Sequence, residues 1–363
     1  MAGQVNRITA RTGHSEYEIL IGNEILSDLC ENELVQSADR IGVVVSSHVY
    51  GFHKDYIENS LQSLKSYKLY QMDDGEENKN YSLAEEYLEK FIKDGFTRNS
   101  VIIGIGGGVV GDFSGYLAAV YMRGLPVIHV PTTLLSMVDS SIGGKVAVNL
   151  SIGKNIVGAF HQPSMVISDV RFLNTLPDNE LINGIVEALK HGLIGDDDSL
   201  RIIEENDINS IRDADVMTRV ITLSAAFKSS VVEKDEKEGG LRAILNYGHT
   251  VGHAIESLME YRGISHGMAV ALGIIAALEI SKRNKMLSEG EVSRVLAVIE
   301  KYSIKRRGLA LNADDLISHM KYDKKNTGGN INFVLLDGIG NPKIKQKVDM
   351  DLLKNVLAEM FKN

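Results

Sequence analysis

GIGGGVVGD, at residues 104–112, is the stretch that decides the fold. It follows a short apolar run at residues 100–105 and precedes FSGYLAAV, a helix-forming segment at residues 113–120. Glycine lets backbone N–H groups approach a pyrophosphate, and the N-terminus of the following helix adds partial positive charge. Gly106, Gly108 and Gly111 also match the G-x-G-x-x-G spacing of dinucleotide-binding turns. The stretch therefore predicts a strand, a phosphate-binding turn and a helix.

A structural alternative stays open for this turn. Dinucleotide-binding domains usually carry an acidic residue about 20 positions further on to bind the ribose, whereas HVPTT occupies residues 129–133 here. Glycines at a tight strand-to-helix turn can also serve only to permit positive φ. From these residues alone, the loop is either a nucleotide site or a tight turn.

The sequence pattern changes at Pro177. Before it, apolar runs at residues 41–45, 101–105 and 127–130 alternate with helical patterns at residues 82–93 and 113–122. This alternation predicts an α/β domain with a mostly parallel sheet, spanning residues 1–176. After it no proline occurs until Pro342, and 3.6-residue periodicity predicts a mainly α-helical domain over residues 177–363. Residues 331–337 and 343–348 predict a hairpin, and residues 268–280 a buried helix.

Composition excludes several classes of protein. A chain of 363 residues with 44% hydrophobic content can bury a large core. Its single cysteine, Cys30, excludes an internal disulfide framework, and the N-terminal residues lack a signal-peptide apolar region. The net charge of -9 argues against nucleic acid as a partner. No apolar run reaches the length of about 20 residues that crosses a bilayer. We therefore expect a cytoplasmic protein without a nucleic-acid or membrane partner.

Two histidines four residues apart, His249 and His253, are candidates for a common ligand. A helix over residues 246–256 would place them on one face with Asn246 and Glu256. The alternative is a solvated polar face. His266 favours a ligand site, since it lies where the apolar helix begins, and a helix N-terminus disfavours the imidazolium form that cannot bind metal.

Glu187 is a third candidate ligand. On a helix, Leu181, Ile185 and Leu189 would take one side, and Glu187 would share the other with Lys190. Alone this pattern is also that of an ordinary surface pair. Two histidines with one carboxylate are, however, the ligand set of catalytic zinc sites with a position open for substrate.

Six motifs in this order closely resemble the 3-dehydroquinate synthases, a family of sugar-phosphate cyclases. They are GIGGGVVGD (104–112), VPTTLLSMVDSSIGGK (130–145), GKNIVGAF (153–160), EALKHG (187–192), LNYGHTVGHAIE (245–256) and SHG (265–267). The resemblance extends from residue 75 to residue 326. It implies an NAD-binding α/β domain, a helical metal- and substrate-binding domain, and a homodimer that acts in the shikimate route to aromatic amino acids.

Position by position, the resemblance implies three groups of site residues. The metal, Zn²⁺ or Co²⁺, would be held by Glu187, His249 and His266. The dinucleotide contacts would be Glu76, Lys79, Gly107, Gly108, Val109, Asp112, Thr132, Thr133, Asp139, Lys145, Lys154, Phe172 and Thr175. The substrate contacts would be Arg123, Asp139, Lys145, Lys154, Asn155, Lys190, Lys228, Glu238, Arg242, Asn246, His253 and one of Lys324 and Lys325. His253, Asn246, Lys145 and Glu238 would be the catalytic residues among them.

The implied reaction converts 3-deoxy-D-arabino-heptulosonate 7-phosphate, a phosphorylated keto acid, to 3-dehydroquinate and inorganic phosphate. NAD⁺ would transiently oxidise one hydroxyl, the neighbouring C–H would become acidic, and phosphate would leave. The hydride would return, and an intramolecular aldol would close the ring. Converging cations would explain how an acidic chain holds a doubly anionic substrate.

The sequence departs from the family pattern at two places. Ser46 and Ser47 stand where an acid often holds the adenosine ribose, so weaker NAD binding is expected. Met268 stands where His-Gly-Glu is usual, which removes a carboxylate near the metal and puts the metal affinity in doubt.

Three other functions are compatible with parts of the pattern. Another cyclase, such as a 2-deoxy-scyllo-inosose or valiolone-type synthase, would share the NAD and metal motifs, although Lys154, Asn155, Arg242 and residues 323–325 favour a substrate with a carboxylate. A polyol dehydrogenase of the glycerol dehydrogenase type would produce net NADH. An inactive ligand-binding paralogue would not need all three metal ligands and His253.

Overall fold

The computed structural model describes residues 5–13, 15–64, 67–260, 263–304, 309, 311–322 and 331–362. The chain forms two compact units, Met1–Pro177 with Ala214–Glu233, and Asp178–Asp213 with Lys234–Asn363. Residues 214–233 thus group with the α/β unit, although they follow the change of sequence pattern at Pro177. Within the described residues, no helix is both long and apolar enough to span a membrane.

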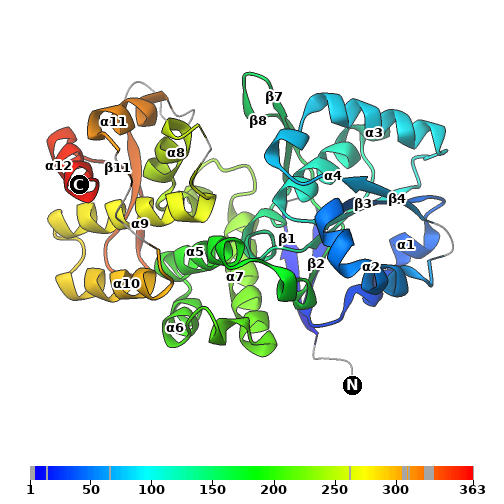
Figure 1. Cartoon of the computed structure of the whole chain (residues 1–363), viewed down its shortest axis with the longest axis horizontal. Helices are drawn as coiled ribbons and strands as arrows, with labels where there is room; N and C mark the ends of the chain where they lie inside the picture. Colours follow the sequence, from blue (N-terminus) through cyan, green and yellow to red (C-terminus); the bar gives the residue numbers. More distant parts are fainter. Residues whose placement is uncertain are drawn as a thin grey trace. The chain divides into compact units, whose positions relative to one another are not determined.

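A seven-stranded sheet forms the centre of the α/β unit (Figure 1). In spatial order its strands are β1 (Asn6–Arg11), β2 (Glu16–Gly22), β9 (Met165–Asp169), β6 (Val127–Pro131), β5 (Val101–Gly106), β3 (Ile41–Ser46) and β4 (Lys68–Met72). β1 and β2 are antiparallel, and the remaining neighbouring pairs are parallel. The prediction of a mostly parallel sheet is confirmed.

Helices cover both faces of this sheet. They are α1 (Glu33–Ser37), α2 (Ser47–Leu61), α3 (Tyr81–Lys93) and α4 (Gly108–Val120), with the short helices η1 (Leu26–Glu31), η2 (Glu76–Asn78), η3 (Tyr121–Arg123), η4 (Ser136–Ser140) and η5 (Val170–Thr175). Successive strand residues point to opposite faces, so Val43 packs in a cluster with Ile57 of α2, and Val44 in one with Phe113 of α4. α4 begins at Gly108, before the predicted start at residue 113, because the glycine-rich stretch forms its first turn.

The order of the strands sets the place of a ligand site. From β3 the chain moves outward to β4, and then returns to β5 on the other side of β3. At such a switch point the connections after two neighbouring strands diverge, and ligands bind beside the carboxyl ends of those strands. Ser46 ends β3 and Gly106 ends β5, so the glycine-rich loop lies at this position.

Two further elements complete the α/β unit. The hairpin of β7 (Lys145–Leu150) and β8 (Gly153–Phe160) packs against α4, and α7 (Ala214–Lys234) joins from later in the chain. Nδ2 of Asn6 in β1 donates to Oγ1 of Thr222 in α7 over 3.2 Å. The α/β unit is therefore assembled from two separate stretches of sequence.

The second unit is built around one buried helix, as residues 268–280 predicted. It contains α5 (Asp178–Ile194), α6 (Asp197–Glu205), η6 (Ser210–Arg212), η7 (Leu241–Asn246), α8 (His249–Leu258), α9 (His266–Arg283), α10 (Glu289–Lys301), α11 (Ala313–Tyr322), α12 (Met350–Met360) and the hairpin of β10 (Asn332–Leu336) and β11 (Pro342–Lys347). α9 packs against α5, α8, α10, α12 and β10. The predictions of a helical domain and a late hairpin are confirmed.

Close packing of α8 on α9 depends on glycine. A Cβ atom placed on Gly273 would lie 1.8 Å from the carbonyl oxygen of Gly248. Gly248 itself has φ of +79°, a conformation that L residues rarely adopt, and it turns the chain into α8. Since His249 is the first residue of α8, this contact sets where its imidazole lies.

Candidate metal centre and dinucleotide site

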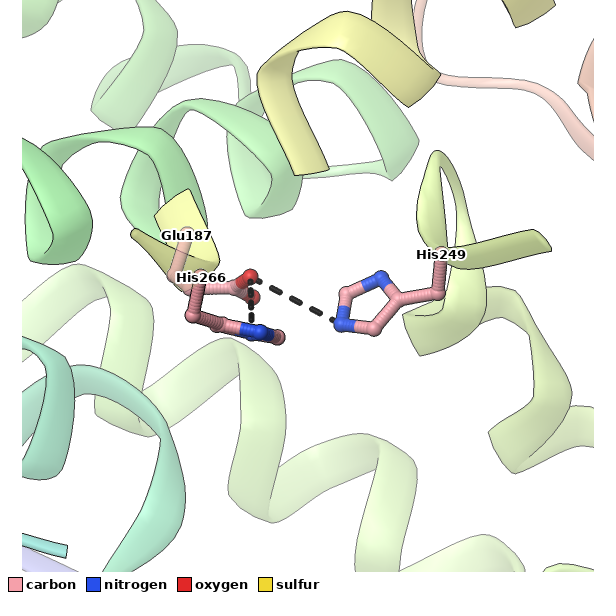
Figure 2. A group of neighbouring side chains, drawn as sticks. All are labelled: Glu187, His249 and His266. Carbon is pink, nitrogen blue, oxygen red and sulfur yellow. Dashed lines mark ion pairs between the residues drawn. The ribbon is translucent and has the colours of Figure 1, made fainter. Parts of the chain in front are cut away.

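Glu187 of α5, His249 of α8 and His266 of α9 point toward one another in the helical unit (Figure 2). Oε1 of Glu187 lies 3.7 Å from Nε2 of His249 and 3.6 Å from Nε2 of His266. The Glu187 side chain is fully buried, while His249 is 12% and His266 33% exposed. The three predicted ligands therefore share one enclosed cluster, and a solvated face is the wrong description of His249.

Each histidine of the cluster is held through its second ring nitrogen. Nδ1 of His249 lies 3.2 Å from the carbonyl oxygen of Tyr247, and Nδ1 of His266 lies 3.2 Å from Oε1 of Glu256. A carbonyl or carboxylate oxygen accepts, so Nδ1 donates in both contacts. In a neutral ring, Nε2 then keeps its lone pair toward Glu187, which is the arrangement of metal-binding histidines.

The cluster fits a divalent transition metal. With ligand distances of about 2.0–2.2 Å, ligand atoms of a tetrahedral zinc site are about 3.3–3.6 Å apart. The two separations from Glu187 to the histidines, 3.7 and 3.6 Å, are near this range. Three protein ligands leave a fourth position for water or substrate, as in catalytic sites.

A buried ion pair supports the carboxylate of the cluster. Lys190, one turn further along α5, pairs with Oε2 of Glu187, and the two side chains are 1% and 0% exposed. The surface-pair alternative for these residues is therefore wrong. Buried charges are normally paired, and Lys190 supplies the opposite charge for the buried carboxylate of Glu187.

The two histidines differ in protonation. Burial and the nearby Lys190 ammonium lower the pKa of His249 well below its usual value. Burial alone would also lower the pKa of His266, but the nearby carboxylates of Glu187 and Glu256 raise it to about 10. His249 is thus neutral, while His266 carries a proton that metal binding must displace.

A carboxylate from another helix, Glu256, contacts His266. The departure at Met268 predicted the loss of a carboxylate near the metal, yet Oε1 of Glu256 lies 3.2 Å from the metal-side imidazole of His266. Glu256 comes from the last turn of α8, so it reaches α9 from another helix. The sequence places Glu256 on the polar face with His249, but gives no signal of its contact with His266.

The predicted acid/base residues lie in the same unit. The rings of His253 and His249 have centroids 5.3 Å apart. The expectation that Asn246 shares their helix is wrong, because η7 ends at Asn246 and Gly248 breaks the chain before α8. Nδ2 of Asn246 donates to Oε1 of Glu238 over 2.8 Å, so these two predicted residues are in contact.

Arg242 lies in the first turn of η7, directly after the loop that carries Glu238. It is 3% exposed, and its Nη1 donates to the carbonyl oxygen of Glu236. The carboxylate of Asp235 accepts from three backbone N–H groups of this loop, including that of Arg242, which lowers the pKa of Asp235. Two further predicted substrate cations of this unit, Lys324 and Lys325, lie outside the described residues.

A pocket in the α/β unit is lined by the glycine-rich loop. Its lining is Gly104, Gly106, Gly107, Gly108, Gly111, Asp112, His129, Pro131, Ser136, Ser140, Ser141, Lys145 and Val146. Four of the predicted dinucleotide contacts are among them: Gly107, Gly108, Asp112 and Lys145. Since α4 begins at Gly108, the unpaired N–H groups of its first turn lie beside this pocket.

The glycines of this loop provide room and not unusual backbone angles. None of the glycines between residues 104 and 111, all of them described, has positive φ. A Cβ atom on Gly104 would lie 2.1 Å from Oγ of Ser114, and one on Gly106 would lie 2.6 Å from Cβ of Val110. The alternative of a turn that needs positive φ is therefore wrong.

Buried polar atoms line or adjoin the same pocket. Nδ1 of His129, Oγ1 of Thr132 and Oγ of Ser141 are buried with no hydrogen-bond partner among the described residues. Such atoms are usually satisfied by water or by a ligand. Burial, with a smaller contribution from His161, lowers the pKa of His129 to about 4, so its ring is neutral.

Lys79 joins the predicted dinucleotide residues to the β7–β8 hairpin. Its Nζ donates to Oδ2 of Asp112 and to Oδ1 of Asn155, each over 2.7 Å, and lies 3.3 Å from Oε1 of Glu76. The residue is 3% exposed. Burial alone would lower the pKa of Lys79, but Asp112 and Glu76 outweigh it and raise the value, so the ammonium stays charged.

The predicted substrate contacts of this unit lie on several elements. Lys145 begins β7, and Lys154 and Asn155 follow the turn into β8. Nζ of Lys228 on α7 lies 2.7 Å from Oδ1 of Asp139 and also donates to its carbonyl oxygen. Arg123 is exposed and has φ of +75°.

The last predicted dinucleotide contacts flank the sheet. Thr132 and Thr133 follow β6, and the N–H of Thr132 donates to the carbonyl oxygen of Gly106 over 3.0 Å. Val109 is in the first turn of α4. Oγ1 of Thr175 lies 2.8 Å from Nε2 of His53. Phe172 is 2% exposed and packs in the core.

A carboxylate adjoins the turn where Ser46 replaces the usual acid. Oγ of Ser46 donates to Asp74 over 2.8 Å, and the N–H of His48 donates to the same carboxylate over 3.1 Å. Ser47 similarly donates to Asp73 over 2.9 Å. Both acids follow β4, the strand beside β3, so the structure supplies negative charge that the local sequence lacks.

This fold and these two sites define the class of protein. A crystal structure of 2-deoxy-scyllo-inosose synthase, complexed with carbaglucose-6-phosphate, NAD⁺ and Co²⁺, superposes with a TM-score of 0.88 at 29% identity, over 98% of this chain and 99% of that one. The chain is thus of the sugar-phosphate cyclase class.

Sequence comparison narrows the class to one family. Residues 69–183 match the family model of the 3-dehydroquinate synthase N-terminal domain, and residues 184–326 that of the C-terminal domain. The 3-dehydroquinate synthase of Acidithiobacillus ferrooxidans is 40% identical over 93% of both chains. That of Caldanaerobacter subterraneus subsp. tengcongensis is 44% identical over 86% of this chain and 88% of its own. The chain belongs to the 3-dehydroquinate synthase family, as its motifs predicted.

Proposed function

We propose that this chain is an enzyme that converts 3-deoxy-D-arabino-heptulosonate 7-phosphate to 3-dehydroquinate and inorganic phosphate. The cluster of Glu187, His249 and His266 is the observation that carries the proposal. Its two imidazoles are held through Nδ1, its carboxylate is buried, and one coordination position is left for a substrate oxygen. Membership of the family at about 40% identity supports the same substrate.

The proposed cofactors are NAD and a divalent ion, Zn²⁺ or Co²⁺, in the two sites described. NAD would accept and return a hydride, and the ion would polarise oxygens of the substrate as a Lewis acid. NAD would be held by the pocket of Gly107, Gly108 and Asp112 in the α/β unit. The N–H groups of the first turn of α4 would face its pyrophosphate. We also propose a homodimer.

The residues of the chain would bind anions and move protons. Lys145, Lys154, Lys228 and Arg242 are the cations proposed to hold phosphate and carboxylate groups. His253 would move the proton of the substrate hydroxyl, and Asn246, held by Glu238, would orient that hydroxyl. The remaining site residues named from the resemblance stay proposed in the roles given there.

Phosphate release tests the proposal directly. Purified protein with NAD and Zn²⁺ or Co²⁺ should release inorganic phosphate from heptulosonate phosphate, and a chelator should stop the release. NADH should not accumulate during the reaction. A polyol dehydrogenase, in contrast, would produce net NADH. Absence of phosphate release from metal-loaded protein would overturn the assignment.

A second function has one observation in its favour. The superposition on 2-deoxy-scyllo-inosose synthase covers nearly the whole chain, so a sugar phosphate without a carboxylate is the alternative substrate. Glucose 6-phosphate assayed in parallel separates the two. Faster phosphate release from glucose 6-phosphate than from heptulosonate phosphate would favour this second function.

A further inference from the structure

Asn149 lies at the end of β7, between two groups of proposed ligand contacts. Its Nδ2 group donates to the carbonyl oxygen of Glu76 over 3.1 Å and to Oε1 of Glu76 over 2.8 Å. Its Oδ1 accepts from the backbone N–H of Asn155 over 2.8 Å. One amide thus holds a proposed dinucleotide residue with its nitrogen and a proposed substrate residue with its oxygen.

The backbone of Asn149 ties the same two segments together. Its N–H donates to the carbonyl oxygen of Lys79 over 2.8 Å, and Asn149 pairs with Asn80 in an isolated parallel bridge. The segment of residues 76–80 is therefore attached to the β7–β8 hairpin through both the main chain and the side chain of Asn149. Movement of either segment must displace the other.

Asn155 receives a defined conformation from these contacts. It has φ of +53°, in the left-handed region that asparagine tolerates better than most residues. Asn149 holds its N–H, and Lys79 donates to its Oδ1 over 2.7 Å. Because Oδ1 is engaged by Lys79, the group that Asn155 offers to a ligand is its Nδ2 donor. A donor suits an oxygen of an anionic substrate.

We propose that Asn149 is a positioning residue that couples dinucleotide binding to the placement of Asn155. The inference rests on the proposed function for the identity of both ligands. When Glu76 and Lys79 are fixed by a bound dinucleotide, Asn149 and Lys79 hold Asn155 with its amide nitrogen available. Asn149 itself touches neither ligand, and its effect passes through its two neighbours.

Two substitutions distinguish the contact of the Asn149 amide with Glu76 from its contact with Asn155. Asn149→Ala removes both, whereas Asn149→Asp keeps an acceptor for the N–H of Asn155 and places a carboxylate oxygen against Glu76. Each lost hydrogen bond corresponds to about fivefold in affinity. Asn149→Ala should therefore raise the Kd for NAD and the KM for heptulosonate phosphate about fivefold each.

Asn149→Asp should affect the Kd for NAD but not the KM for heptulosonate phosphate. Repulsion from Glu76 should raise the Kd for NAD at least as much as in Asn149→Ala. At saturating NAD, the KM for heptulosonate phosphate should stay within about twofold of the unsubstituted enzyme, since the hydrogen bond to Asn155 is kept. Asn341→Ala is the matched control, because that amide also closes a hairpin, through a 2.8 Å bond to the carbonyl oxygen of Asp337. It should change neither parameter.

Hydrogen exchange of the hairpin tests the coupling without turnover. NAD alone should slow amide exchange in residues 149–156 of the unsubstituted protein and of Asn341→Ala, and Asn149→Ala should lose that protection. This readout stands even if heptulosonate phosphate proves not to be the substrate. NAD-dependent protection of residues 149–156 that persists in Asn149→Ala would overturn the proposal, as would identical kinetic constants for the Ala and Asp variants.

Discussion

The glycine-rich loop and the metal-type cluster are built in opposite ways. The loop uses backbone atoms of one contiguous stretch, residues 104–112, and depends on the absence of side chains. The cluster uses side chains of three segments and buries an ion pair to support them. Ligand binding at the loop should therefore be sensitive to added volume, whereas the cluster should be sensitive to lost charge.

Removal of charge from the cluster should have the largest effect. Glu187→Gln keeps the size of the side chain but removes the anionic ligand and leaves Lys190 buried without its counter-charge. Metal affinity should fall by more than about 100-fold, since loss of an outer partner alone costs about 10–100-fold. Competition with a chelator measures the metal affinity, and calorimetry measures NAD binding, which should not change.

Glu204→Gln is the control for this substitution, because Glu204 pairs with Arg294 in the same unit. It should leave metal affinity intact. Equal metal affinities for Glu187→Gln and Glu204→Gln would show that the cluster holds no metal.

Replacement of glycine by alanine should change the free energy of unfolding in opposite directions in the two regions. Gly273→Ala should lower the free energy of unfolding by about 2–3 kcal/mol, because the added methyl meets backbone and not a movable side chain. Gly111→Ala has no atom within 4 Å of the new methyl and lies inside α4, so it should raise stability by about 0.5–1 kcal/mol. Urea titrations measure both, and a stable Gly273→Ala protein would refute the packing of α8 on α9.

Glu256 offers a finer test of the cluster. Glu256→Gln should weaken metal binding about 10–100-fold, because the carboxylate that orients His266 is lost. NAD affinity should stay unchanged. Adding Met268→Glu to the Glu256→Gln protein tests whether a carboxylate at residue 268 restores the lost metal affinity. Unchanged metal affinity in Glu256→Gln alone would contradict the role given to Glu256.

The last prediction concerns the effect of His129 on the pH dependence of stability. Its folded pKa of about 4 lies below the unfolded value near 6.5. Below about pH 6.5 the unfolded chain binds a proton that the native state refuses, so stability is lost as pH falls toward 4. The loss from this group should be roughly 2 kcal/mol between pH 7 and pH 5. Urea titrations of His129→Gln should show a weaker decline over that interval, and an equal decline would exclude His129 as its source.

Local sequence predicted much of both regions. The strand, turn and helix around residues 104–120 follow from glycine and from short apolar runs, and they are confirmed. Glu187, His249 and His266 were predicted as one group, and the structure brings them together. Residue type at fixed spacing predicted the loop, whereas the grouping of the three ligands was implied by the resemblance to the 3-dehydroquinate synthases.

Contacts between distant segments could not be predicted in this way. Ser46 gains Asp74 from a neighbouring strand, and His266 gains Glu256 from another helix. Asn149 contacts Glu76, which lies 73 residues earlier in the chain. Each pairing depends on how elements pack, and a single sequence contains no local pattern for it. The effects of Ser46 on NAD binding and of Met268 on metal binding therefore stay predictions, to be weighed against these added carboxylates.

The return of α7 to the α/β unit has a consequence for how the protein is made. A ribosome that has released residues 1–177 has not yet supplied the residues that bond to β1 and to Asp139. The α/β unit is complete only when residue 233 has been synthesised, which is after residues 178–213 of the other unit. Neither unit corresponds to a single uninterrupted fragment, so a clone cut at Pro177 would encode an unfinished protein.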